Sequence, residues 1–75
     1  MNYAQAFKQI REETQMSRKD LAEKLGCTPS SLSKIERGIV VPKEHTLIKL
    51  AHVTQNPLAR IYTLAFDYGD FVVTE

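Results

Sequence analysis

The chain has 75 residues and a net charge of +1, which leaves room for one domain and not for a second. Its one cysteine, Cys27, has no partner for an internal disulfide, and this favours a reducing, cytoplasmic setting. The sequence has neither a charged-then-apolar leader nor an apolar run of membrane-spanning length, so secretion and a membrane span are not expected.

The charges are distributed unevenly along the chain. All 10 Lys and Arg lie at or before Arg60 together with 6 of the 9 acidic residues, which gives this part a charge of +4. The remaining acidic residues are Asp67, Asp70 and Glu75. A basic body with an acidic tail is typical of a protein whose front meets phosphate, although an ordinary solvated surface also fits this modest excess.

Apolar residues at helical spacing predict five helices around one core, and therefore an all-α fold. The first helix is expected over Tyr3 to about Thr14, with Phe7 and Ile10 facing inward. The others are expected over residues 17–26 including the caps, 29–36, 44–53 and 57–69. The last six residues, DFVVTE, are expected to form a short extended tail after Gly69.

The second and third helices carry strong boundary residues. Ser17 is a good N-cap, Asp20 is its reciprocal partner in a capping box, and Gly26 closes the second helix in a left-handed conformation. Thr28 caps the third helix and Pro29 follows at its first position. Two short helices joined by a turn that contains Gly are the arrangement that carries a DNA-recognition helix.

The third helix predicts a surface for DNA. Leu32 and Ile35 point into the core, so the opposite face is small, hydroxylated and basic, and no acidic residue lies on it. Its expected base contacts are Pro29, Ser30, Ser33 and Lys34, with Lys34 able to reach guanine O6 or N7. Arg18, Arg37 and Lys43 flank this face and are expected to contact phosphate.

Other readings of the same residues are weaker or compete with DNA binding. The hydroxylated face could be the solvated side of an inert bundle, or the fold could be a protein-interaction module. Cys27 is expected to fill space as a small apolar residue instead of acting as a redox sensor. With one Cys, His45 and His52 do not make a metal-ligand set, and no nucleophile lies beside a base at catalytic spacing, so neither a cofactor nor an enzyme is expected.

The run MSRKDLAEKLGCTPSSLSKIERG, followed by a proline and then TLIKLA, resembles the phage-repressor-like (Cro/repressor-type, xenobiotic-response-element) helix-turn-helix family. The resemblance covers about Ile10 to Val53. It implies a five-helix domain that binds a palindromic operator as a homodimer. By position in the motif, it also implies that Thr28 and Ser31, at the start of the recognition helix, contact the DNA backbone, and we therefore expect both to be phosphate contacts. It also implies a structural ion pair between Arg11 and Glu36, in line with the need to neutralise an acid beside a DNA-binding face.

The chain departs from the family pattern in three places. Arg18 stands where Gln is usual, which alters the geometry of a phosphate contact. Pro29 and Ser30 replace longer amides, so direct base readout is expected to be thin. The loop Ile39–Val41 is apolar where polar or basic residues are common, which either removes a phosphate contact or marks a contact with thymine methyls or with protein.

The predicted fifth helix is apolar on too many sides to serve one core, and such a patch usually marks an interface. We expect a two-fold dimer through Tyr62, Phe66, Tyr68, Phe71 and Val73; the alternative is a tail that folds back on its own core.

The expected organisation is a single domain over 1–75, with a DNA-binding core over 1–55 and a dimerisation segment over 56–75. The function expected is transcriptional regulation by a bacterial or phage-encoded protein, most simply a repressor or autoregulator. Phage repressors, restriction–modification controllers and antitoxin-like regulators all fit, and activation also fits.

Overall fold

The structure, a computed structural model, describes residues 2–69 and the side chains of residues 2–66. Five α-helices make up this part, and it contains no strand, so the predicted all-α fold is confirmed. The helices are α1 (Tyr3–Glu13), α2 (Arg18–Leu25), α3 (Pro29–Glu36), α4 (Glu44–Thr54) and α5 (Leu58–Gly69). None of them is long and apolar enough to cross a membrane.

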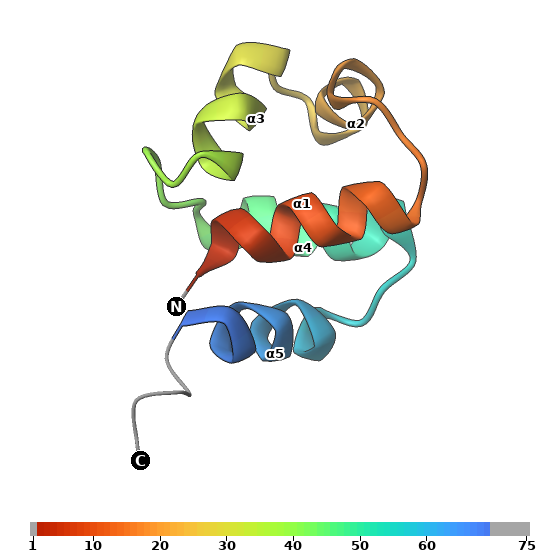
Figure 1. Ribbon diagram of the computed structural model, residues 1–75. Helices are drawn as coiled ribbons and strands as arrows, with labels where there is room; N and C mark the ends of the chain where they lie inside the picture. Colours follow the sequence, from red (N-terminus) through yellow and green to blue (C-terminus); the bar gives the residue numbers. More distant parts are fainter. Residues whose placement is uncertain (1, 70–75) are drawn as a thin grey trace.

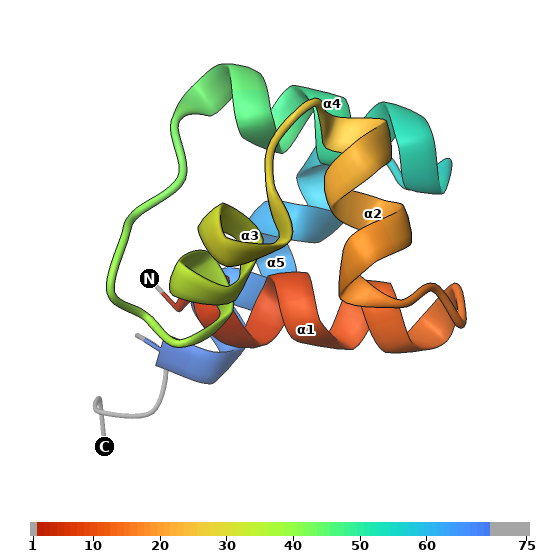
Figure 2. The ribbon, with the colours of Figure 1, turned by 90° about the horizontal axis from the view of Figure 1, so that it is seen from above.

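The helices form three levels. Figure 1 shows α2 and α3 above, α1 and α4 in the middle and α5 below. In agreement, α2 packs against α3 and α4, and α1 packs against both α3 and α5. Viewed from above in Figure 2, α2 and α3 lie over α1, and the loop from α3 to α4 runs along one edge of the molecule. This arrangement leaves the upper sides of α2 and α3 open to solvent.

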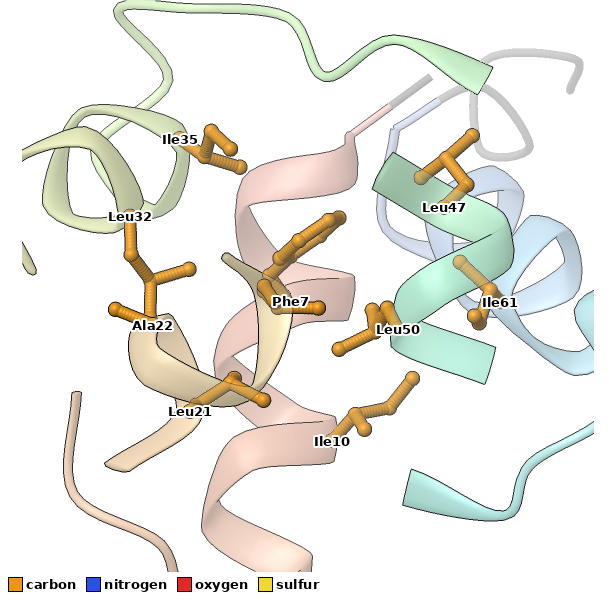
Figure 3. Close-up of a cluster of buried hydrophobic side chains, with 10 residues drawn as sticks. Phe7, Ile10, Leu21, Ala22, Leu32, Ile35, Leu47, Leu50 and Ile61 are labelled. Carbon is orange, nitrogen blue, oxygen red and sulfur yellow. The ribbon is translucent and has the colours of Figure 1, made fainter. Parts of the chain in front are cut away.

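Phe7 lies at the centre of the core and is fully buried (Figure 3). Leu32 and Ile35 of α3 lie on one side of its ring, and Leu50 of α4 and Ile61 of α5 lie on the other. Burying a side chain of this size stabilises a fold by about 1.5–3 kcal/mol. Because one ring joins elements from both ends of the chain, the position of α3 depends on the whole core.

The predicted helix boundaries agree with the structure to within one or two residues, which is the usual uncertainty of helix ends. Ser17 Oγ accepts a hydrogen bond from the Asp20 backbone N–H at 3.0 Å, as an N-cap does. Lys43 precedes α4 without a side-chain cap bond. The predicted extended tail lies outside the described residues.

The apolar face of α4 is narrower than its sequence indicates. Leu47 and Leu50 are buried, whereas their apolar neighbour Ile48 is half exposed. Consecutive helical residues are about 100° apart, so Leu47 turns inward and its neighbour Ile48 turns outward. In α5, Ile61 and Ala65 are buried and Phe66 is exposed.

Candidate nucleic-acid interface

The turn between α2 and α3 is built by backbone geometry at Gly26. Gly26 has φ +77°, a left-handed conformation that glycine adopts without strain. The Cys27 backbone N–H donates to the Ala22 carbonyl at 2.9 Å, which closes the helix end. From α4, the Lys49 ammonium donates to the Leu25 carbonyl at 3.4 Å and covers another open carbonyl. The turn therefore holds α3 at a fixed angle to α2.

The start of α3 is capped by the two hydroxyls expected at phosphate. Thr28 Oγ1 accepts from the Ser31 backbone N–H at 3.1 Å, and the Thr28 hydroxyl donates to Ser31 Oγ at 3.1 Å. Both side chains are exposed. Because the Ser31 oxygen accepts this bond, its own O–H remains able to donate to an oxygen outside the protein.

The outer face of α3 is open to solvent at four of its five predicted positions. Pro29, Ser30, Lys34 and Arg37 are exposed, while Leu32 and Ile35 face the core. Ser33 is only half-buried, because it follows the fully buried Leu32 by a single step of about 100° around the helix. The centre of the exposed face is thus formed by Ser30, Lys34 and Arg37.

Glu36, the only acidic residue between Lys24 and Lys43, is turned away from this face. Its side chain is 1% exposed, and both of its carboxylate oxygens are occupied. Arg11 donates through Nε to Oε2 at 2.8 Å and through Nη2 to Oε1 at 3.3 Å. The structure thus brings together the two residues expected to form an ion pair, and the carboxylate is buried and does not lie on the exposed face of α3.

A second arginine completes this cluster. Arg18, at the first position of α2, donates through Nε to Glu36 Oε1 at 2.9 Å. Its side chain is 46% exposed, compared with 15% for Arg11. The two guanidinium groups and the carboxylate together carry a charge of +1, beside the first turn of α2. Sequence reasoning placed Arg18 at phosphate alone and missed this ion pair, because nothing local connects the start of α2 with the end of α3.

The loop after α3 is apolar, exposed and tied to the recognition helix. The backbone N–H groups of Ile39 and Val40 both donate to the Lys34 carbonyl, at 2.9 and 3.3 Å. Ile39, Val40 and Val41 are 62%, 43% and 75% exposed. Pro42 is buried, so the loop is anchored at both ends. Lys43 follows it, exposed, at the N-cap of α4.

An open hollow of about 260 Å³ lies between this loop, the α2–α3 turn and the start of α4. Cys27 lines it and is half-buried. Burial raises the pKa of the Cys27 thiol, although the nearby Lys49 ammonium opposes this shift. A half-buried thiol in this environment suits a space-filling side chain. Within the described residues, no three His, Cys, Asp or Glu side chains are grouped as metal ligands.

The residues expected at a dimer interface are placed only in part. Tyr62 is half-buried, with its ring 6.4 Å from that of Tyr3 in an edge-on arrangement. Phe66 is 45% exposed. The side chain of Tyr68, and Phe71 and Val73 altogether, lie outside what the structure describes.

Sequence reasoning also missed a link between the two ends of the chain. Arg60 of α5 donates through Nη1 and Nη2 to the two carboxylate oxygens of Glu13, at 2.8 and 2.9 Å. Gln9 donates to the same carboxylate at 3.1 Å. The pKa of Glu13 is lowered to about 2, chiefly by the bond from Arg60 and then by that from Gln9. The spacing of 47 residues leaves no local pattern that could have predicted it.

Comparison with known proteins agrees with this geometry. A family model described as helix-turn-helix matches residues 7–61, which include all of α2, α3 and α4. No curated protein and no solved structure matches the chain.

Proposed function

Because the chain belongs to the Cro/repressor-type helix-turn-helix family of DNA-binding regulators, we propose that it is a repressor that occupies a palindromic operator as a homodimer. The observation that carries the proposal is the open face of α3, centred on Ser30, Lys34 and Arg37. The nearest acid along the helix, Glu36, is buried and neutralised by two arginines. An α-helix with such a face fits the major groove of B-DNA.

We assign base reading to this face and positioning to its surroundings. Pro29 and Ser30 bring the helix backbone close to the bases, Lys34 donates to guanine O6 or N7, and the half-buried Ser33 contributes at the rim of the face. Phosphate contacts come from Arg18, Thr28, Ser31, Arg37 and Lys43. All five of these side chains are exposed. Arg37 lies at the C-terminal end of the α3 face, and the other four lie at the start of α2, at the start of α3 and at the N-cap of α4. Such contacts set register and orientation without reading sequence.

A homodimer is supported by the exposed apolar surface of α5. Phe66 is 45% exposed, and Tyr62 and Leu64 on the same helix are only partly buried, so α5 carries apolar surface outside the core. A contiguous apolar patch of this kind is typical of an interface. Two copies related by a two-fold axis would place their recognition helices about 34 Å apart, in successive major grooves. Residues 1–55 would then act as the DNA-binding core, and residues 56–75 would supply the dimer contact.

The experiment that tests this function is selection of bound duplexes from a random pool, followed by titration of the selected duplex in increasing salt. We expect an inverted-repeat consensus and an affinity that falls by several log units per decade of salt. Enrichment of no sequence, together with an affinity that does not respond to salt, would contradict a role as an operator-binding repressor. Reporter transcription from a promoter that carries the consensus then distinguishes repression from activation.

A second candidate function is a protein-interaction module on the same fold. The specific observation that favours it is the apolar loop Ile39–Val41, with Val41 75% exposed beside the recognition helix. Binding to a protein partner through this loop would be insensitive to salt and would be abolished by Val41→Asp. DNA binding that survives Val41→Asp with unchanged sequence preference would favour the repressor.

A further inference from the structure

We propose that Glu36 is a positioning residue that orients the Arg18 guanidinium toward a DNA phosphate. The proposal rests on the proposed DNA-binding function and adds to it a role for a buried carboxylate that cannot touch DNA itself. Glu36 belongs to the recognition helix and Arg18 to the first position of α2, so one hydrogen bond connects the element that reads bases with a side chain that holds the backbone.

The geometry of the guanidinium makes this connection directional. A guanidinium is planar and rigid, so fixing its Nε–H fixes the plane in which its terminal N–H groups lie. In Arg18 the Nε–H donates to Glu36 Oε1 at 2.9 Å, and within the described residues no hydrogen bond engages the two terminal nitrogens. With the side chain 46% exposed, these terminal groups remain available to the two oxygens of a phosphate.

The carboxylate is a firm anchor for this bond. The Glu36 side chain is 1% exposed, and Arg11 donates to both of its oxygens, at 2.8 and 3.3 Å. Arg11 in turn donates to the Met16 carbonyl at 3.4 Å, in the segment that leads into α2. Arg11 therefore offsets the negative charge of Glu36, and the charge of Arg18 is left to act on DNA.

Two substitutions test the role, because for each of them the expected change in DNA affinity differs from the change that net charge alone would predict. Arg18→Lys keeps the charge but replaces the planar guanidinium with a single ammonium, which cannot bind Glu36 through one nitrogen and present two parallel N–H donors to a phosphate through others. We expect the affinity for the selected duplex to fall about tenfold. Glu36→Gln raises the net charge by one, which by charge alone strengthens DNA binding. We expect it to weaken binding instead, because the single neutral amide oxygen, which Arg11 and Arg18 would have to share, holds the Arg18 guanidinium less firmly than the carboxylate does.

Lys19→Arg is the matched control, because Lys19 is the exposed neighbour of Arg18 and the exchange again preserves charge. Its affinity should stay within twofold of the wild type. Each variant is measured at a temperature at which far-ultraviolet circular dichroism shows it to be folded. If Glu36→Gln does not fold, the comparison of Arg18→Lys with Lys19→Arg still decides the question.

A measurement on the protein without DNA tests whether Glu36 holds the Arg18 guanidinium, independently of DNA binding. The Arg18 Nε–H signal in ¹H–¹⁵N NMR spectra should be protected from exchange in the wild type and should persist in the complex. Wild-type protein that binds no selected duplex would overturn the proposed function. Wild-type binding that Arg18→Lys leaves within twofold, or that Glu36→Gln strengthens, would overturn the positioning role of Glu36 alone.

Discussion

Lys34 is the residue on which base discrimination is expected to depend most. Its side chain is exposed at the centre of the α3 face, and a lysine ammonium can donate to guanine O6 or N7 in the major groove. We expect Lys34→Ala to cost about 1–3 kcal/mol of binding free energy and to relax the preference at one position of each half-site. Repeating the duplex selection with the variant measures this. A sequence profile unchanged from the wild type, with affinity lowered equally for all duplexes, would show that Lys34 contacts only phosphate.

Arg11 makes its contribution to folding, because the carboxylate it neutralises is buried. Replacing Arg11 with Met leaves Glu36 with Arg18 alone, and we expect the free energy of unfolding in urea to fall by about 3 kcal/mol. In the double variant Arg11→Met with Glu36→Met, most of this loss should be recovered, since no buried carboxylate remains and Arg18 is partly exposed. A loss of less than about 1 kcal/mol in the single variant would place the pair among ordinary surface ion pairs.

At the scale of elements, the ion pair between Glu13 and Arg60 ties the end of α1 to α5. The pKa of Glu13 is lowered from its ordinary value of 4.5 to about 2, so its stabilising effect is present above pH 4.5 and is lost as the pH falls toward 2. Because the side chains are 41% and 36% exposed, Glu13→Gln should cost less than about 1 kcal/mol at pH 7.

Thermal unfolding as a function of pH checks this linkage. The difference in Tm between the wild type and Glu13→Gln should narrow between pH 4.5 and pH 2. Glu12→Gln is the control, since Glu12 is the exposed neighbour on the same helix. A difference that stays constant over this range would mean that the charge of Glu13 does not stabilise the fold.

Two residues that follow helices share a left-handed backbone conformation, and substitutions at them should change stability in opposite directions. Gly38, after α3, has φ +78°, and Gln55, after α4, has φ +57°. Nothing lies within 4 Å of a Cβ at Gly38, so Gly38→Ala is disfavoured only by the conformation, by about 1 kcal/mol. Gln55→Gly should raise stability by about 0.5–1 kcal/mol. Chemical denaturation measures the change in the free energy of unfolding for each variant, which should be negative for Gly38→Ala and positive for Gln55→Gly. Changes of the same sign would contradict a left-handed backbone conformation at both positions.

For the whole molecule, the prediction concerns its oligomeric state. A homodimer should have twice the 8.5 kDa mass of the chain, or about 17 kDa, in sedimentation at micromolar concentration. Phe66→Ser removes an exposed apolar ring without disturbing the core, so it should shift the mass toward the monomer and weaken operator binding. Ile48→Ser, half exposed on α4, is the matched control. A monomeric wild type that binds its operator with full affinity would remove α5 from the proposal.

The features that could be predicted from the sequence alone are those fixed by interactions between residues close together in the chain. Caps and breakers such as Ser17, Gly26, Thr28 and Pro29 act within a few residues, so the five helices and the helix-turn-helix could be predicted from the chain alone. The apolar positions of α3 likewise determined which side faces outward, and the family followed from the motif. The helix ends and the outward face of α3 depend on spacings of four residues or fewer, and the family motif depends on the order of these local signals along the chain.

Only the tertiary structure decided how distant charges are paired. Arg18 meets Glu36 across 18 residues, and Arg60 meets Glu13 across 47. No local pattern encodes such contacts, because they depend on the angles at which three levels of helices pack around Phe7. The same packing left Ser33 half-buried and Ile48 half exposed. Helical periodicity gives the direction of a side chain around its own axis, but the neighbouring helices determine how much of it remains in solvent.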